Sequence, residues 1–255
     1  MTHPDTLPGR LLEAFARDGA SPRLTWYGAD GERTELSGRV LANWVTKAAN
    51  LLVEEADAEP GTTVVLDLPV HWRTLVWALA SWTTGARVVL PDEELDEVDV
   101  VVTTDPGTAP GAEGADLVLA VALPALAMSW DGPELPNEVI DAAAELMSYG
   151  DQLGYVSEPE DDDVALVGAG LEATFGELAD WARGTLELGR PSGPDEDDDE
   201  PEPVRALVSP RDLAGLLEQA LAVWRAGGSL VLAEPGTDGG VLDRIAAEER
   251  VDLRW

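Results

Sequence analysis

The alternation of short apolar runs with segments of helical periodicity constrains the fold of this chain more than any other feature. Residues 60–69 and 164–167 contain apolar runs of strand length, and a Pro-Gly pair opens the first. Residues 36–56 instead place apolar side chains at steps of three and four, the period of a helix with one buried face. Strands that alternate with helices in this way indicate an α/β fold of layered, mostly parallel sheets flanked by helices.

The same two patterns predict most of the elements along the chain. Helical periodicity recurs at residues 7–18, 71–85, 211–228 and 241–251. Strand-like runs recur at residues 86–92, 98–106, 115–123, 204–210, 229–235 and 252–255. Continuous apolar runs predict a core that includes Val65, Leu66, Trp77, Leu79, Val88, Val89, Leu166, Leu230 and Val231.

Length and composition favour one domain over residues 1–255. The chain is 45% hydrophobic and 26% charged, so it is able to bury a sizeable core. Residues 189–204 interrupt the pattern, because their concentration of Asp, Glu, Pro and Gly suits neither a helix nor a strand. We expect a solvated acidic loop there and no metal site, since the segment lacks the spaced ligands and the glycine of a calcium loop.

Charge and residue usage exclude several classes of function. The chain has 50 acidic and 16 basic residues, a net charge of −34, and Lys47 as its single lysine. Nucleic acid and anionic membrane surfaces are therefore not expected partners, because both attract clustered Lys and Arg. The acidity indicates a saline cytoplasm or a GC-rich genome, with an acidic partner surface as the alternative. The chain has no cysteine, no secretory signal and no apolar run of membrane-spanning length, so we expect a cytoplasmic protein.

The segment 161–183, DDDVALVGAGLEATFGELADWAR, resembles a phosphate-binding unit in its order of parts. An apolar strand leads into Gly168-Ala169-Gly170, and Thr174 with Glu177 three residues later is a helix-start signal. The spacing also loosely matches a dinucleotide fingerprint, but the second strand with its terminal acidic residue is missing. We therefore expect a plain strand-to-helix turn, with Gly168, Gly170 and Thr174 as the candidate nucleotide-binding positions.

Three stretches together resemble the adenylate-forming superfamily, which includes acyl-CoA synthetases, adenylation domains and luciferases. Residues 24–52, LTWYGADGERTELSGRVLANWVTKAANLL, are similar to the family's opening motif. Residues 59–92 resemble the next block, although Thr62 stands where the family usually has Asp. Residues 224–255, WRAGGSLVLAEPGTDGGVLDRIAAEERVDLRW, resemble a later Gly-Gly strand and helix. The resemblance implies part of the N-terminal domain of these enzymes.

The resemblance also implies that the catalytic parts are missing. The family follows Asp-Asp and an apolar strand with a Thr-Ser-Gly-Thr-Thr-Gly-x-Pro-Lys-Gly loop, whereas Asp162-Asp163 and the strand here lead to GAGLEATFGEL. A triphosphate needs cationic side chains, amides and magnesium, and this turn has no lysine. The sequence stops at Trp255, before the family's Tyr-Gly-x-Thr-Glu motif, ribose-binding Asp and adenylating lysine. We expect no catalytic residue, no metal and no cofactor.

A non-catalytic remnant that binds an unknown protein or a small acyl-type ligand is thus the first functional hypothesis. The alternative is an acyl-CoA synthetase-type enzyme or subunit completed by another chain, which would use ATP or AMP with magnesium. A third hypothesis is a stand-alone nucleotide-binding protein.

The remaining candidates favour structural roles. His71 lies at the start of a predicted helix beside Trp72 without a second histidine, and His3 lies near the terminus. Ser129 and Ser209 have no partnering base in the sequence. Tryptophans near helical spacing indicate core packing or, alternatively, the lining of an acyl pocket: Trp44, Trp72, Trp77 and Trp82.

Overall fold

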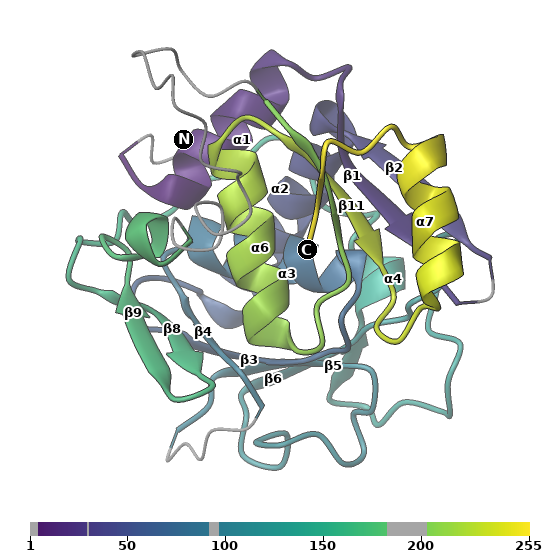
Figure 1. Ribbon diagram of the computed structural model, residues 1–255. Helices are drawn as coiled ribbons and strands as arrows, with labels where there is room; N and C mark the ends of the chain where they lie inside the picture. Colours follow the sequence, from purple (N-terminus) through teal and green to yellow (C-terminus); the bar gives the residue numbers. More distant parts are fainter. Residues whose placement is uncertain (1–4, 30, 92–96, 183–202) are drawn as a thin grey trace.

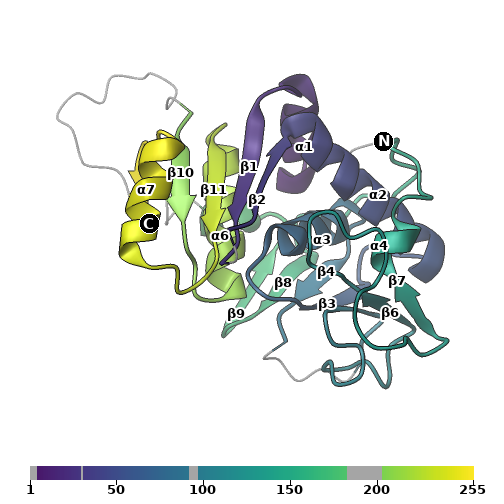
Figure 2. The ribbon, with the colours of Figure 1, turned by 90° about the vertical axis from the view of Figure 1, so that its right-hand side faces the viewer.

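A layer of helices separates two β-sheets in the computed structural model, which describes residues 5–29, 31–91, 97–182 and 203–255 (Figure 1). Viewed from the side, one further helix lies on the outer face of the smaller sheet, and loops lie on the outer face of the larger sheet (Figure 2). The order is therefore helix, sheet, helices, sheet. This arrangement confirms the predicted α/β class.

The smaller sheet, sheet A, has the strand order β12-β10-β11-β1-β2. Its pairs are parallel, except that β1 and β2 form an antiparallel hairpin. Residues alternate between its faces: Leu24 and Trp26 point to the central helices, whereas Tyr27 packs on the outer side. Its strands are β1 (Pro22–Tyr27), β2 (Arg33–Ser37), β10 (Arg205–Val208), β11 (Ser229–Ala233) and β12 (Leu253–Arg254).

The larger sheet, sheet B, has the strand order β7-β6-β5-β3-β4-β8-β9. Only its edge pair, β8 with β9, is antiparallel. Its central strands are buried on both faces, which explains their unbroken apolar sequence. They are β3 (Thr63–Asp67), β4 (Arg87–Val89), β5 (Val100–Thr103), β6 (Leu117–Ala120), β7 (Val139–Asp141), β8 (Val164–Gly168) and β9 (Leu171–Thr174).

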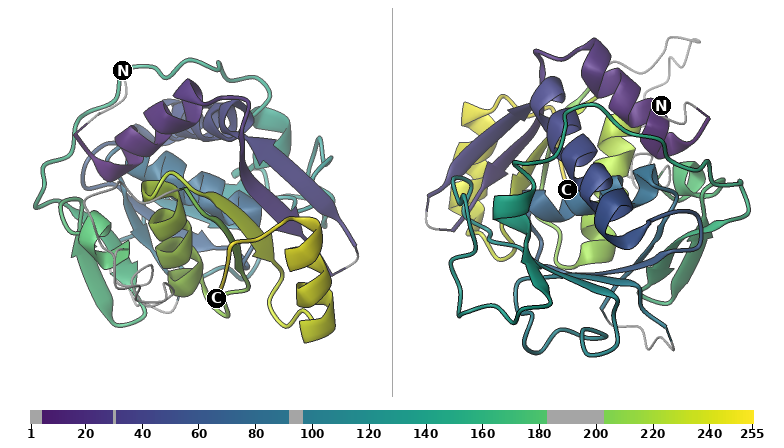
Figure 3. Two further views of the ribbon diagram at one scale, coloured as in Figure 1. Left: turned by 45° about the horizontal axis from the view of Figure 1, so that its top comes forward. Right: turned by 180° about the vertical axis from the view of Figure 1, so that it is seen from behind.

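Five longer helices and one short helix have both ends among the described residues. Helices α1 (Leu7–Arg17), α2 (Gly38–Ala56), α3 (Trp72–Thr83) and α6 (Leu213–Arg225) form the central layer, and α7 (Gly239–Glu248) lies outside sheet A (Figure 3). The short helix α4 (Ala142–Glu145) follows β7. Each long helix begins at a residue whose side chain caps its first turn: Thr6, Ser37, His71, Asp212 and Asp238.

The predicted core is confirmed. All nine predicted residues have an exposed fraction of at most 3%. Most of them belong to one large cluster that joins the central helices to the inner faces of both sheets, while Val65, Val89 and Val231 lie in two smaller clusters on the outer faces. No helix in the described part of the chain is both long and apolar enough to span a membrane.

Two antiparallel hairpins were not predicted. Residues 28–32 join β1 to β2, and the positive φ of Gly31 (+87°) falls in this turn. The turn at residues 168–170 joins β8 to β9, so the prediction that Gly168-Ala169-Gly170 leads directly into a helix was wrong. Helical geometry begins only at residue 178. The predicted acidic loop at 189–204 lies almost wholly outside the described residues.

Candidate functional site

The glycine turn closes the β8–β9 hairpin with only two central residues. Ala169 and Gly170 both have positive φ, +55° and +73°, which is the geometry of a tight hairpin turn that follows the twist of its strands. Gly168 has a φ of +144°, and a Cβ atom there would lie 2.5 Å from Cβ of Leu90. The glycine is therefore required by backbone geometry and by close approach to β4, independently of any ligand.

Thr174 lies at the opposite end of the hairpin from the turn. It pairs with Val164 at the start of β8, about four residues or roughly 13 Å of strand from the glycines. Its backbone N–H donates to Oε2 of Glu177 at 3.0 Å, so the predicted reach of Glu177 back to Thr174 is present. The structure thus brings Gly168 and Gly170 together and leaves Thr174 apart from them.

A groove of about 450 Å³ begins beside the glycine turn. It lies beyond the carboxyl ends of β3 and β4, and the start of α6 closes its other side. In open α/β sheets this edge is the usual place for a ligand, because the loops that follow the strands converge there. The groove is lined by Leu68, Pro69, Val70, Leu90, Pro91, Ala169, Arg211, Asp212, Leu213 and Ala214.

The lining of this groove is apolar apart from two neighbouring residues. Among the described residues that line the groove, Arg211 is the one with a cationic side chain. Asp212 is engaged at the start of α6, where Oδ1 accepts a hydrogen bond of 2.8 Å from the N–H of Gly215. The groove therefore suits an apolar molecule that carries one acidic group near Arg211.

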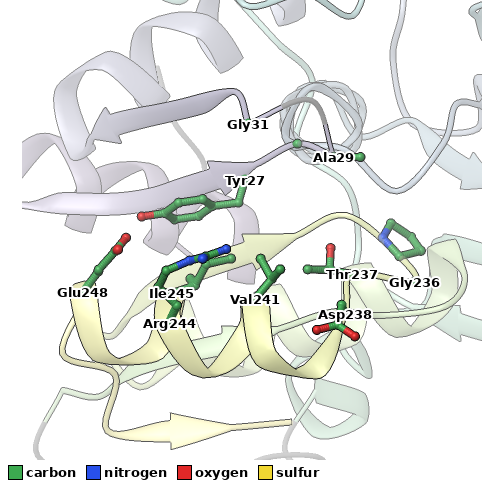
Figure 4. A pocket seen from close by; sticks show the side chains of 12 residues that line it. Tyr27, Ala29, Gly31, Gly236, Thr237, Asp238, Val241, Arg244, Ile245 and Glu248 are labelled. Atoms are coloured by element: carbon green, nitrogen blue, oxygen red, sulfur yellow. The ribbon is translucent and has the colours of Figure 1, made fainter.

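A second pocket, of about 490 Å³, lies on the outer side of sheet A (Figure 4). The β1–β2 turn, the β11–α7 turn and one face of α7 surround it. Tyr27, Val241 and Ile245 supply its apolar surface, while Asp238, Arg244 and Glu248 contribute charges of both signs. Two carboxylates against one guanidinium make this pocket a poorer match for an acidic ligand than the groove at the glycine turn.

A partly buried polar cluster next to the second pocket holds the end of α7 on sheet A. Glu249 accepts hydrogen bonds from the hydroxyl of Tyr27 at 2.5 Å, from Nε of Arg33 at 2.9 Å and from Nη2 of Arg205. Burial opposes the ionisation of Glu249, but these hydrogen bonds outweigh it and lower the pKa of the carboxyl group. The donors come from three strands, so the cluster is structural.

His71 has the structural role that the sequence indicates. Its Nδ1 accepts from the N–H of Arg73 at 3.2 Å and caps α3, and its ring packs edge-on against Trp26. Burial, aided by the charge of Arg73, lowers the pKa of His71 to about 3, so the ring is neutral. Trp72, Trp77 and Trp82 are core residues.

The importance of Arg73 was not predicted. Its guanidinium lies 4.5 Å from the ring centre of Trp72 and 5.3 Å from that of Trp44, and it donates to the backbone carbonyls of Leu123, Pro124 and Ala125. Burial lowers its pKa to about 10. A lone arginine in an apolar helix, HWRTLVWALA, was the signal available in the sequence, because a buried cation requires partners. Lys47 similarly donates to the carbonyl of Tyr149.

Comparison with known proteins identifies one curated relative and a set of similar folds. No family model matches the sequence. The curated protein is a "TIGR03089 family protein" from Mycobacterium tuberculosis (strain ATCC 25618 / H37Rv), which is 34% identical over 272 residues that cover 98% of each chain.

Solved structures of adenylate-forming enzymes share the fold. An acyl-CoA synthetase from Brucella canis matches 96% of this chain with a TM-score of 0.72 and 17% identity. The N-terminal subdomain of NpsA from Klebsiella oxytoca, in complex with 3-hydroxybenzoyl-AMSN, has a TM-score of 0.66 and 15% identity. The amide bond synthetase McbA from Marinactinospora thermotolerans has a TM-score of 0.65 and 19% identity. The matches cover 46%, 58% and 47% of those chains, so this chain spans about half of each.

Proposed function

The chain belongs to the TIGR03089 family, and we propose that it is a non-catalytic binding protein built on the N-terminal fold of adenylate-forming enzymes. In this proposal the groove beside the glycine turn holds a small acyl-type ligand, namely an apolar carboxylic acid or its acyl derivative. The protein acts in the cytoplasm and forms no acyl adenylate.

The two-residue hairpin turn is the observation that carries this proposal. The resemblance to adenylate-forming enzymes implies a hydroxyl-rich loop with a lysine between the apolar strand and the following helix. Here β8 reverses into β9 through Ala169 and Gly170, without a hydroxyl or a cation in the turn. A triphosphate bound at this point would lack the charge neutralisation that phosphoryl and adenylyl transfer require.

The groove supports binding of an acyl ligand rather than a nucleotide. Its apolar walls come from Leu68, Val70, Leu90 and Leu213, and Arg211 is the side chain able to pair with a carboxylate. A single exposed guanidinium is sufficient for one negative charge but not for three phosphates. The predicted site residues Gly168 and Gly170 then shape the groove mouth rather than contact phosphate.

Ligand-induced stabilisation tests the binding proposal directly. Medium-chain and aromatic carboxylic acids, acyl-CoAs, CoA, AMP and ATP are added singly, and the melting temperature is recorded. A ligand at about 100 times its dissociation constant adds roughly 2.7 kcal/mol to the free energy of unfolding. We expect stabilisation by an acid or acyl derivative that Arg211→Gln abolishes and Arg244→Gln, in the second pocket, leaves unchanged. Stabilisation by ATP alone would instead support a nucleotide-binding protein.

The second candidate function is an enzyme completed by another chain. It is favoured by the observation that this chain spans about half of the similar adenylate-forming structures. Carboxylate-dependent exchange of pyrophosphate into ATP distinguishes the two. We expect no exchange above background with the purified protein, alone or with magnesium. Exchange that depends on a co-purified second chain would establish the enzyme and overturn the non-catalytic proposal.

A further inference from the structure

The outer face of sheet B has an unusual cover for a parallel sheet. Such sheets nearly always have helices on both faces. Within the described chain, the apolar cluster on the outer face contains only strand and loop residues. They are Val65, Val89, Val101, Ala109 and Val118, with Val98, Ala112, Ala115, Val139 and Val167 packed against them. Figure 1 shows loops rather than helices beneath this sheet.

A groove of about 630 Å³ opens into this cover between the loop at residues 106–116 and the segment at residues 136–139. Val118 and Val139 at the sheet edge form its apolar floor together with Ala109 and Ala112 of the loop. Three exposed carboxylates, Glu113, Asp116 and Glu138, stand on its rim. No Lys, Arg or His is among the described residues that line it.

The charge around this groove differs from that of the rest of the molecule. Residues 88–182 contain 23 Asp and Glu residues and no Lys, Arg or His. This stretch supplies β5, β6, β7, β8 and β9, which make up most of sheet B. The described basic residues all lie outside this stretch: Arg87 begins β4, and the others lie on or next to the central helices, sheet A and α7. Apart from Arg87 at one end of β4, the charged side chains on the described strands of sheet B are therefore all carboxylates.

We propose that the groove on the outer face of sheet B is a docking site for a basic, amphipathic segment of a partner protein. The apolar side chains of the segment would cover the half-buried Ala112 and Val139, and its Lys or Arg side chains would pair with Glu113, Asp116 and Glu138. This site is separate from the groove at the glycine turn and does not depend on the ligand proposed there.

The combination of floor and rim selects this occupant over others. A hydrated polyamine would satisfy the carboxylates but leave the apolar floor uncovered. A second copy of this chain carries the same charge of −34 and would be repelled. A segment that carries both apolar and cationic side chains matches the apolar floor and the carboxylates of the rim. Lys and Arg also lay their apolar stems on apolar surface while their charge stays at the rim.

Titration with a designed peptide tests the site. The probe is a fluorescent helical peptide of about 14 residues with Leu on one face and Lys on the other. We expect Glu113→Gln/Asp116→Asn/Glu138→Gln to weaken binding about tenfold at roughly 0.1 M salt. The matched control, Glu54→Gln/Glu59→Gln/Glu248→Gln, removes three exposed carboxylates elsewhere and should change the affinity less than about twofold. Ala112→Arg, which places a cation in the groove, should weaken binding as strongly as the first triple variant.

Amide hydrogen exchange locates the bound peptide. We expect slower exchange at residues 105–118 when the peptide is present and no such change with spermine alone. Equal weakening in the two triple variants would show that only the overall charge attracts the peptide, and the proposal would fail. It would also fail if spermine bound as tightly as the peptide, because the apolar floor would then contribute nothing. A circular dichroism spectrum of each variant confirms that it is folded.

Discussion

The carboxylate of Glu249 accepts a hydrogen bond of 2.5 Å from the hydroxyl of Tyr27, which lies 222 positions earlier in the chain. Tyr27 ends β1 and Glu249 follows the last residue of α7 as its C-cap, so this contact joins the outer helix to sheet A. The side chain of Glu249 is only 8% exposed and also forms ion pairs with Arg33 and Arg205. Removal of the carboxylate would therefore leave Arg205, whose side chain is 19% exposed, without its ionic partner, whereas Arg33 would keep its ion pair with Glu35.

Glu249→Ala should lower the free energy of unfolding by about 2 kcal/mol, because Arg205 and Tyr27 lose a partly buried acceptor. Glu249→Gln should cost less, since the amide oxygen still accepts one hydrogen bond. Urea denaturation measures both changes. The neighbouring Glu248 is exposed, and Glu248→Gln should remain within about 0.5 kcal/mol of the original protein. Equal effects at the two positions would contradict a structural role for the cluster.

The two glycines of the β8–β9 turn should differ in their tolerance of a side chain. Gly168→Ala should destabilise the protein by about 3 kcal/mol, because its Cβ would meet Leu90 at 2.5 Å. Gly170→Ala should cost only about 1 kcal/mol, since the space around that position is open and the cost comes from positive φ alone. Thermal unfolding of both variants provides the comparison. A smaller effect at Gly168 than at Gly170 would mean that the approach of β8 to Leu90 is looser than described.

His71 should make stability depend on pH below neutrality. Its ordinary pKa of 6.5 applies in the unfolded chain, whereas in the folded protein the pKa is about 3. Between these values the unfolded state binds a proton that the folded state does not, so stability falls as the pH drops below 6.5. At pH 5 the loss should be about 2 kcal/mol relative to pH 7.5.

His71→Asn isolates this contribution, because asparagine is able to cap α3 but does not titrate. The difference in unfolding free energy between the original protein and the variant should shrink by that amount between pH 7.5 and pH 5. The carboxylates titrate in both proteins and cancel in the comparison. A difference independent of pH would show that the imidazole is hydrated in the folded protein.

Salt should stabilise the protein. With a net charge of −34, repulsion among carboxylates opposes the compact state in dilute buffer, and counterions screen it. The melting temperature should therefore rise between dilute buffer and about 1 M KCl, where the screening length is roughly 3 Å. Sucrose at equal osmolality is the control, because it is excluded from the protein surface but does not screen charge. A rise in melting temperature with KCl that exceeds the rise with sucrose is therefore due to screening. A flat profile would mean that the acidic side chains are too widely spread to destabilise the fold.

Much of the fold follows from the order of residues along the chain. Val64, Val65 and Leu66 lie in an unbroken apolar run, and such a run is stable in water only as a strand buried on both faces. The period of Leu41, Val45, Ala48 and Leu52 likewise requires one buried helix face. These are local properties, because each depends on residues a few positions apart. They were sufficient for the α/β class and for the predicted core.

Tertiary structure decided what the glycine turn and the polar residues do. A strand followed by glycines, Thr174 and Glu177 is compatible with a helix or with a returning strand, and the pairing of β9 with β8 selected the strand because it satisfies the backbone hydrogen bonds of that edge. Arg73 and Glu249 have partners 50 and 222 positions away. The groove at Ala169 likewise needs the ends of β3 and β4 and the start of α6. Local sequence carries no information about such distances, since only the packing of the two sheets against the central helices brings these residues together.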